Sequence, residues 1–191
     1  MGLSTLVMLT RMGGEAEISL AAQPAGVPSR PVPDFSLPDQ FGHTRDIKFP
    51  GEKIMLLTVA DRKGAKEIET WIAPIRGRYG HDLQIEGIAD VSSAPAGMHR
   101  LVRNAIREQI TYPIMLDWKG DIAKSFRYQR GHANIYILNP KGQIIWQHAG
   151  PASEEGIHVL LRLLDQHLGQ TESRTPTLLK RDARPDTGVS R

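Results

Sequence analysis

A short charged segment, Asp61 to Lys66, carries the side chains best suited to hold a ligand. It reads Asp-Arg-Lys-Gly-Ala-Lys and lies between a predicted strand over 54–60 and a predicted helix. Backbone N–H groups at a helix N-terminus attract anions, and nearby cations add to that attraction. Arg62, Lys63 and Lys66 could therefore hold a phosphate or a carboxylate. The alternative is that Asp61 caps the helix while the three cations are simply solvated.

The sequence lacks the residues of several common reactive sites. It contains no cysteine, which excludes thiol catalysis, disulfides and thiolate zinc sites. No serine lies in a nucleophile-elbow pattern, and no glycine-rich phosphate loop is present. The seven histidines do not pair at metal-ligand spacing. We therefore expect no metal, no cofactor and no thiol-type catalytic residue.

The composition limits the partners and the compartment. The net charge is only +3 and the basic residues do not gather in one run, so we expect no nucleic-acid partner. No run of about 18 apolar residues is present, so we expect no membrane span. The expected partner is another protein or a small anionic ligand. A cysteine-free chain fits the cytoplasm, which we expect, or alternatively the periplasm.

The chain divides into three parts by composition. Residues 13–33 are rich in glycine, alanine and proline, which is typical of a linker. The polar stretch over 169–191 has few large apolar residues, which is typical of a disordered tail. We therefore expect a flexible leader over 1–32, one domain over 33–168 and a disordered tail over 169–191.

Within the domain, apolar runs and stripes alternate between strand and helix patterns. The predicted strands cover 54–60, 83–91, 114–117, 135–138 and 143–148, with a hairpin turn at 139–142. The first helix has an apolar stripe of Ile68, Trp71, Ile72, Ile75 and Tyr79, is kinked at Pro74 and ends at Gly80. The second helix has an inner face of Met98, Leu101, Val102, Ala105 and Ile106. A short helix over 121–127 and a last helix capped by Ser153 complete an α/β sandwich around a central mixed sheet.

Four segments resemble the thioredoxin-like superfamily, specifically its peroxiredoxin and redoxin (AhpC/TSA-type) branch. Pro33 to Gly42 is similar to the opening motif P-x-F-x-L-x-D-x-x-G of that branch. The segment from Tyr112 to Gly120 is similar to its Y-P-x-x-x-D-x-x-G motif. The strand over 54–60 and the hairpin around 135–142 resemble its central strand and closing hairpin. The resemblance implies a thioredoxin-like fold for a cysteine-free member.

The resemblance also implies where the missing redox site would lie. The family's cysteine stands at the start of the helix after the central strand, where the helix N-terminus lowers the thiol pKa. Counting from the strand end places the redox pair at Arg62 and Ala65. Counting back from the residues around Pro74 places it at Lys66 and Glu69. Neither alternative supplies a nucleophile.

The family's second hallmark is a cis-proline beside this loop. The hairpin places that position at Ala133, where no proline is present, so we expect a trans peptide bond. His132 and Asn134 should then face the charged loop and join the candidate ligand site. Some enterobacterial periplasmic thioredoxin-like proteins share the cysteine-free pattern and a closing segment similar to that over 143–150.

Two functions remain open from the sequence. The first is a redox-inactive thioredoxin-like domain that acts as a protein- or ligand-binding accessory module in a stress or redox pathway. The second is a non-thiol enzyme or anion-binding protein that uses the basic loop over 61–66. The residues do not support an antioxidant or oxidoreductase activity, although the scaffold resembles proteins with that chemistry.

Overall fold

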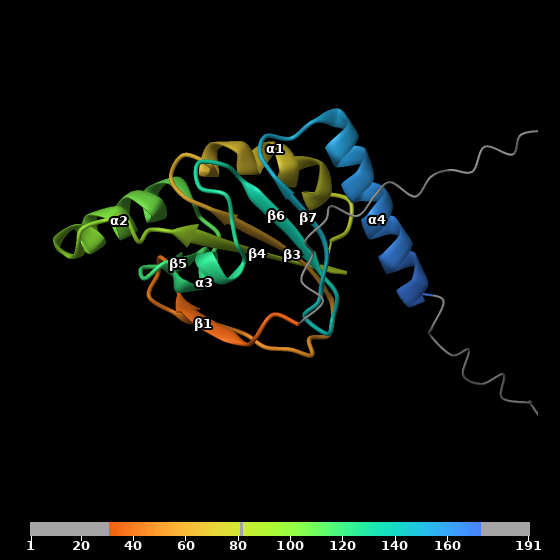
Figure 1. Cartoon of the computed structure of the whole chain (residues 1–191), viewed down its shortest axis with the longest axis horizontal. Coiled ribbons are helices and arrows are strands. Elements are labelled where there is room, and N and C mark those ends of the chain that lie inside the picture. Colours follow the sequence, from red (N-terminus) through yellow and green to blue (C-terminus); the bar gives the residue numbers. More distant parts are fainter. Residues whose placement is uncertain (1–30, 81, 173–191) are drawn as a thin grey trace, which may run out of the picture.

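The computed structural model describes residues 31–80 and 82–172 (Figure 1). Most of the predicted leader and tail therefore lies outside the described residues. The elements are, in chain order, β1 (Phe35–Pro38), β2 (Thr44–Ile47), β3 (Ile54–Ala60), α1 (Ala65–Arg76), β4 (Leu83–Asp90), the 3-10 helix η1 (Ala96–Met98), α2 (His99–Gln109), β5 (Met115–Asp117), α3 (Asp121–Ser125), β6 (Asn134–Leu138), β7 (Ile144–Ala149) and α4 (Glu154–Glu172). The last helix thus continues four residues past position 168.

A mixed five-stranded sheet forms the centre of the domain, in the order β5-β4-β3-β6-β7. Strand β3 pairs in parallel with β4 and antiparallel with β6, while β5 is parallel to β4 and β7 antiparallel to β6. All seven residues of β3 are buried. A continuous apolar run is what a strand covered on both faces requires, and the predicted α/β sandwich with a mixed sheet is confirmed.

Helices α1 and α4 cover one face of this sheet (Figure 1). Trp71 is fully buried there, and its indole N–H donates to the carbonyl of Gly150 at 3.0 Å. Alternate residues of β3, Ile54 and Leu56, point into this layer. The other core residues of the layer are Ile72, Ile75, Tyr79, Leu83, Ala133, Ile135, Ile137, Leu160 and Leu164.

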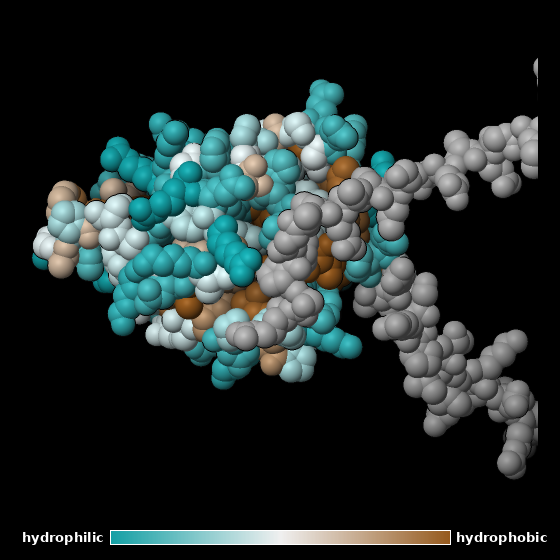
Figure 2. All heavy atoms as spheres, in the orientation of Figure 1, coloured by the Kyte–Doolittle hydropathy of each residue, from teal (hydrophilic) through white to brown (hydrophobic). Residues whose placement is uncertain are grey.

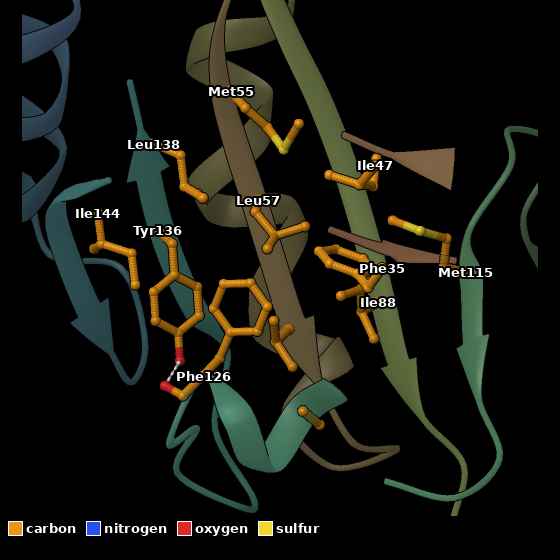
Figure 3. Packing of buried hydrophobic residues seen from close by; sticks show 12 residues of the cluster. Phe35, Ile47, Met55, Leu57, Ile88, Met115, Phe126, Tyr136, Leu138 and Ile144 are labelled. Atoms are coloured by element: carbon orange, nitrogen blue, oxygen red, sulfur yellow. Dashed lines mark hydrogen bonds between the residues drawn. The ribbon is translucent and has the colours of Figure 1, made fainter. Parts of the chain in front are cut away.

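The opposite face is covered by α3 and by the β1–β2 hairpin. Figure 3 shows this second core layer, in which Phe35 of β1 packs edge-to-face on Phe126 after α3, with ring centroids 6.0 Å apart. The hydroxyl of Tyr136 donates to the Phe126 carbonyl at 3.1 Å, so the buried phenol is satisfied. The hairpin pairs Phe35 with Ile47. The sheet therefore lies between two apolar core layers.

Two helix predictions are corrected by the structure. Helix α1 ends at Arg76, before the predicted Gly80, although Tyr79 is still buried. None of the α2 residues is buried, and Leu101 is 62% exposed, so the predicted inner face is wrong. Helix α2 projects from one end of the molecule (Figure 1), where apolar and polar surface are mixed (Figure 2). The neighbouring edge strand β5 has only three residues and offers little surface to cover that stripe.

The five predicted strands and the short helix α3 agree with the structure to within two residues, whereas β1, β2 and η1 were not predicted as elements. The hydroxyl of Ser153 accepts the N–H of Gly156 at 3.0 Å, which confirms the predicted cap of the last helix. Pro74 lies inside α1, as predicted. Trp118 is half-buried and stacks on His99 at 4.1 Å between ring centroids. Among residues 31–80 and 82–172, no helix combines the length and the apolar character needed to cross a membrane.

Candidate functional site

Three aspartates mark one edge of the sheet. Asp61 directly follows β3, Asp90 ends β4 and Asp117 ends β5. These strands are parallel, so their carboxyl ends meet at the same edge, where α/β sheets commonly bind ligands. Asp117 is used structurally, because its carboxylate accepts the N–H groups of Gly120 and Ala123 at 2.8 and 2.9 Å. The candidate site lies around the other two.

The carboxylate of Asp61 forms hydrogen bonds with two loops, the one after β3 and the one before β6. One oxygen accepts the N–H groups of Lys63 and Gly64 at 3.0 and 2.9 Å. The other oxygen accepts the N–H of Gly131 at 2.8 Å. These contacts shape the turn before α1, whose N-cap is Gly64 and which has no side-chain cap, and they hold the loop after β3 against the loop before β6. Ligand binding by this loop stays a prediction.

Gly64, the N-cap residue of α1, lies directly against the peptide between His132 and Ala133. A Cβ atom placed on Gly64 would lie 2.1 Å from the His132 carbonyl oxygen and 2.8 Å from the Ala133 nitrogen. Its φ is −67°, so glycine is required here by close packing and not by backbone conformation. No side chain fits at this position without displacing one of the two loops.

Glu67 lies three residues later, in the first turn of α1. Its Oε2 accepts the N–H of Ala133 at 2.9 Å, and its Oε1 lies 3.6 Å from Nδ1 of His132. Gly64 and Glu67 therefore both contact the 132–133 peptide, and they have the spacing of a C-x-x-C pair. The sequence analysis did not single out either residue, because their contact partners lie more than 60 positions away along the chain.

The residues predicted across from the loop have different surroundings. The side chain of His132 is 45% exposed and faces Glu67. Asn134 is buried, and its amide exchanges hydrogen bonds with the backbone of Gln129 at 2.7 and 2.9 Å. The one cis peptide bond within the described ranges precedes Pro50, so the bond before Ala133 is trans, as expected. Asn134 thus orders its own loop and does not present its amide to the surface.

The three cations of the loop form an exposed basic rim. Arg62, Lys63 and Lys66 are all exposed. The Lys63 side chain runs over Gly131, where an added Cβ would lie 3.7 Å from Nζ. Within the described part of the chain, no group of three or more His, Asp or Glu side chains is placed to hold a metal ion. The arrangement can attract an anion or an acidic surface.

A second polar cluster surrounds Asp90, whose side chain is 2% exposed. Its carboxylate accepts hydrogen bonds from the Ser92 N–H at 3.0 Å, the Arg130 guanidinium at 3.1 Å and the Tyr128 hydroxyl. Burial acts to raise the pKa of Asp90, but these hydrogen bonds outweigh it and lower that pKa below 3.8. Burial, reinforced by the hydrogen bond to Asp90, raises the pKa of Tyr128 to about 12. At neutral pH the cluster therefore contains a carboxylate, a guanidinium and a neutral phenol.

Comparisons with known proteins identify the fold. No family model matches the chain, and no curated protein matches it. Solved structures do match. The proposed thiol:disulfide interchange protein DsbE of Chlorobium tepidum is 15% identical with a TM-score of 0.58, covering 73% of this chain and 96% of its own. The exposed lipoprotein thioredoxin Etrx1 of Streptococcus pneumoniae is 16% identical with a TM-score of 0.55, covering 69% and 99%.

StoA of Bacillus subtilis gives a similar result, at 20% identity and a TM-score of 0.53, covering 71% of this chain and 98% of its own. These identities establish a shared fold and leave the activity open. The sheet order and the covering helices agree with that fold, while no position of this sequence is cysteine. The chain is therefore a cysteine-free protein with the thioredoxin-like fold.

Proposed function

We propose that this chain is a redox-inactive thioredoxin-like domain that acts as a protein- or ligand-binding accessory module in a stress or redox pathway. The observation that carries the proposal is the packing of Gly64 and Glu67 against the peptide between His132 and Ala133. A thiol at position 64 has no room, and the carboxylate of Glu67 is committed to a backbone N–H. The scaffold is kept while its redox centre is filled by structural contacts.

The rim of Arg62, Lys63 and Lys66 supports a binding role for the same end of the domain. These side chains are exposed, whereas Asp61 beneath them is held by three backbone N–H groups. A fixed loop that carries solvent-facing cations attracts acidic partners over a distance of about a Debye length. We propose this rim as the contact surface for an acidic protein segment or a small anion.

The proposal is tested first by redox assays on the full chain. The protein should neither reduce insulin disulfides nor consume a hydroperoxide above a buffer control, with an active thioredoxin as the positive control. Turnover in either assay would reject the proposal. A double variant, Arg62→Ala with Lys63→Ala, should remain folded, because both side chains are exposed.

The second candidate is a non-thiol enzyme or anion-binding protein that uses the loop over 61–66. The exposed cations beside the half-buried His132 are the observation in its favour. A thermal-shift screen of phosphorylated and carboxylated metabolites separates the two candidates. A stabilising ligand whose effect disappears in the Arg62→Ala, Lys63→Ala variant would favour this second function, and turnover of that ligand would establish an enzyme.

The compartment belongs to the proposal as well. The sequence predicts the cytoplasm, with the periplasm as the alternative. The similarity to an exposed lipoprotein thioredoxin supports a location outside the cytoplasm. Fractionation of the native cells with an antibody to this chain tests the two compartments directly.

A further inference from the structure

A shallow cavity of about 340 Å³ opens beside the carboxyl end of β4. It is lined by Asp90, Lys124, Arg127, Tyr128 and Arg130. None of these residues belongs to the loop over 61–66. The volume is within the range of small-molecule sites, which begins at about 300 Å³.

The floor of the cavity is held in place by buried Asp90. Its carboxylate binds both the Tyr128 hydroxyl and the Arg130 guanidinium, and Nε of Arg130 donates to the Tyr128 hydroxyl at 3.0 Å. A second guanidinium nitrogen of Arg130 lies 3.3 Å from the hydroxyl of Ser92. These contacts fix Tyr128 and Arg130 before any ligand arrives, so binding does not require them to be ordered.

Arg127 has an unusual backbone conformation at the mouth of the cavity. It is the one residue other than glycine with a positive φ, 52°, within the described ranges. Its N–H donates to the Lys124 carbonyl at 2.9 Å and the Tyr128 N–H to the Ala123 carbonyl at 3.5 Å, which is the Schellman arrangement that ends α3. Glycine is the usual residue at that position. An arginine is therefore kept there at a cost in conformational energy.

The charges of the cavity are unbalanced. The cavity is lined by three cations, which are Lys124, Arg127 and Arg130. It has one carboxylate, that of Asp90, and Arg130 already contacts it. No hydrogen bond or ion pair is found for the Arg127 guanidinium within residues 31–80 and 82–172. The partner of Lys124 is the exposed Asp121, 3.9 Å away, and such surface pairs are weak. Two cations are thus available to a ligand.

We propose that this cavity binds a small molecule through a phosphate group. The planar fork of Arg127 suits two oxygens of a phosphate, and Lys124 adds a second cation. The charge of a phosphate, close to −2 at neutral pH, matches the two available cations. This inference goes beyond the proposed function, because it does not involve the vestigial redox site or the basic rim.

The test is titration calorimetry of the full chain with pyrophosphate as the probe, at low ionic strength. Arg127→Gln and Lys124→Gln should each weaken binding about tenfold or more, since each removes a charged hydrogen bond. Arg100→Gln, which makes the same charge change on exposed α2, should leave the affinity within about twofold. Both cavity residues are exposed, so the variants should keep the unfolding midpoint of the parent protein.

Several results would overturn the proposal. Equal weakening by Arg100→Gln would show non-specific attraction, and no measurable binding of pyrophosphate would remove the site. If binding is lost only in an Arg62→Ala, Lys63→Ala variant, then pyrophosphate binds at the basic rim and not in this cavity. Binding of citrate but not of pyrophosphate would exclude the phosphate class. None of these results changes the redox assays, so the two proposals fail independently.

Discussion

The carboxylate of Glu67 accepts the backbone N–H of Ala133 at 2.9 Å, across 66 positions of the chain. Ala133 is fully buried, so its backbone N–H is a buried donor that needs an acceptor. Glu67 stands three residues after Gly64, at the spacing of a redox pair, and supplies that acceptor. One hydrogen bond therefore joins the first turn of α1 to the buried start of the loop before β6.

Replacing Glu67 should destabilise the fold. Ala133 is fully buried, so Glu67→Ala leaves its N–H without a partner and should cost about 1–3 kcal/mol of unfolding free energy. Urea unfolding of the full chain measures the change. Glu67→Gln keeps an acceptor oxygen and should recover part of the loss. Glu69→Ala, which removes an exposed pair with Arg76, should change stability by less than about 0.5 kcal/mol.

Gly64 should tolerate no side chain. Gly64→Ala places a Cβ 2.1 Å from the His132 carbonyl oxygen, so the loops must separate, at a cost of about 2 kcal/mol or more. Gly77→Ala is the matched control, because nothing lies within 4 Å of its added Cβ, and it should stay within about 0.5 kcal/mol. If chemical denaturation finds the two variants equally stable, the close packing of Gly64 is not what fixes this site.

The fold was largely predictable, and the exceptions have physical causes. Strand β3 is recognised by its continuous apolar run, because a strand covered on both faces has few polar positions. Strand β2 has a single buried residue, Ile47, which is too weak a pattern to predict a hairpin. The apolar stripe of α2 correctly predicts a helix, but the helical spacing of apolar residues does not show which element, if any, packs against them. The edge strand β5, which has only three residues, does not cover the stripe of α2.

The candidate site was only half predictable. The loop after β3 was expected to face the segment around Ala133, and Asp61 does accept the N–H of Gly131, while ligand binding by that loop stays a prediction. Gly64 and Glu67 were missed, since a glycine and an acidic residue are ordinary at a helix N-terminus. What distinguishes them is contact with a loop more than 60 residues away. Such pairing is a property of tertiary packing that local patterns do not contain.

Raising the pH should remove the contribution of Tyr128. Its pKa is about 12 in the folded protein, against about 10 in an unfolded chain. A raised pKa adds stability that is fully present below pH 10 and lost as the pH rises through 12. Tyr128→Phe should therefore be less stable than the parent at pH 8, and the gap should close between pH 10 and 12. Tyr112→Phe, at an exposed position, is the control and should change the urea midpoint at pH 8 only slightly.

Lowering the pH should act through Asp90. Its folded pKa lies below the ordinary 3.8, so its contribution is present above that pH and is lost as the pH falls through the folded pKa. Asp90→Asn should cost stability at pH 7, and the difference from the parent should shrink below pH 4. A difference that stays constant from pH 7 to 2 would mean that the ionised carboxylate is not what Tyr128 and Arg130 require.

Substitutions of Arg127 should change the stability of the fold and the affinity for pyrophosphate independently. Its φ of 52° is unfavourable for arginine, so Arg127→Gly should raise the unfolding free energy by about 0.5–1 kcal/mol. Arg127→Gln keeps the strained backbone and should leave stability unchanged. Both variants should lose affinity for pyrophosphate equally, because both remove the guanidinium from the cavity. A less stable glycine variant would show that the arginine side chain itself supports the fold, and the conformational cost could then no longer be read as a sign of ligand binding.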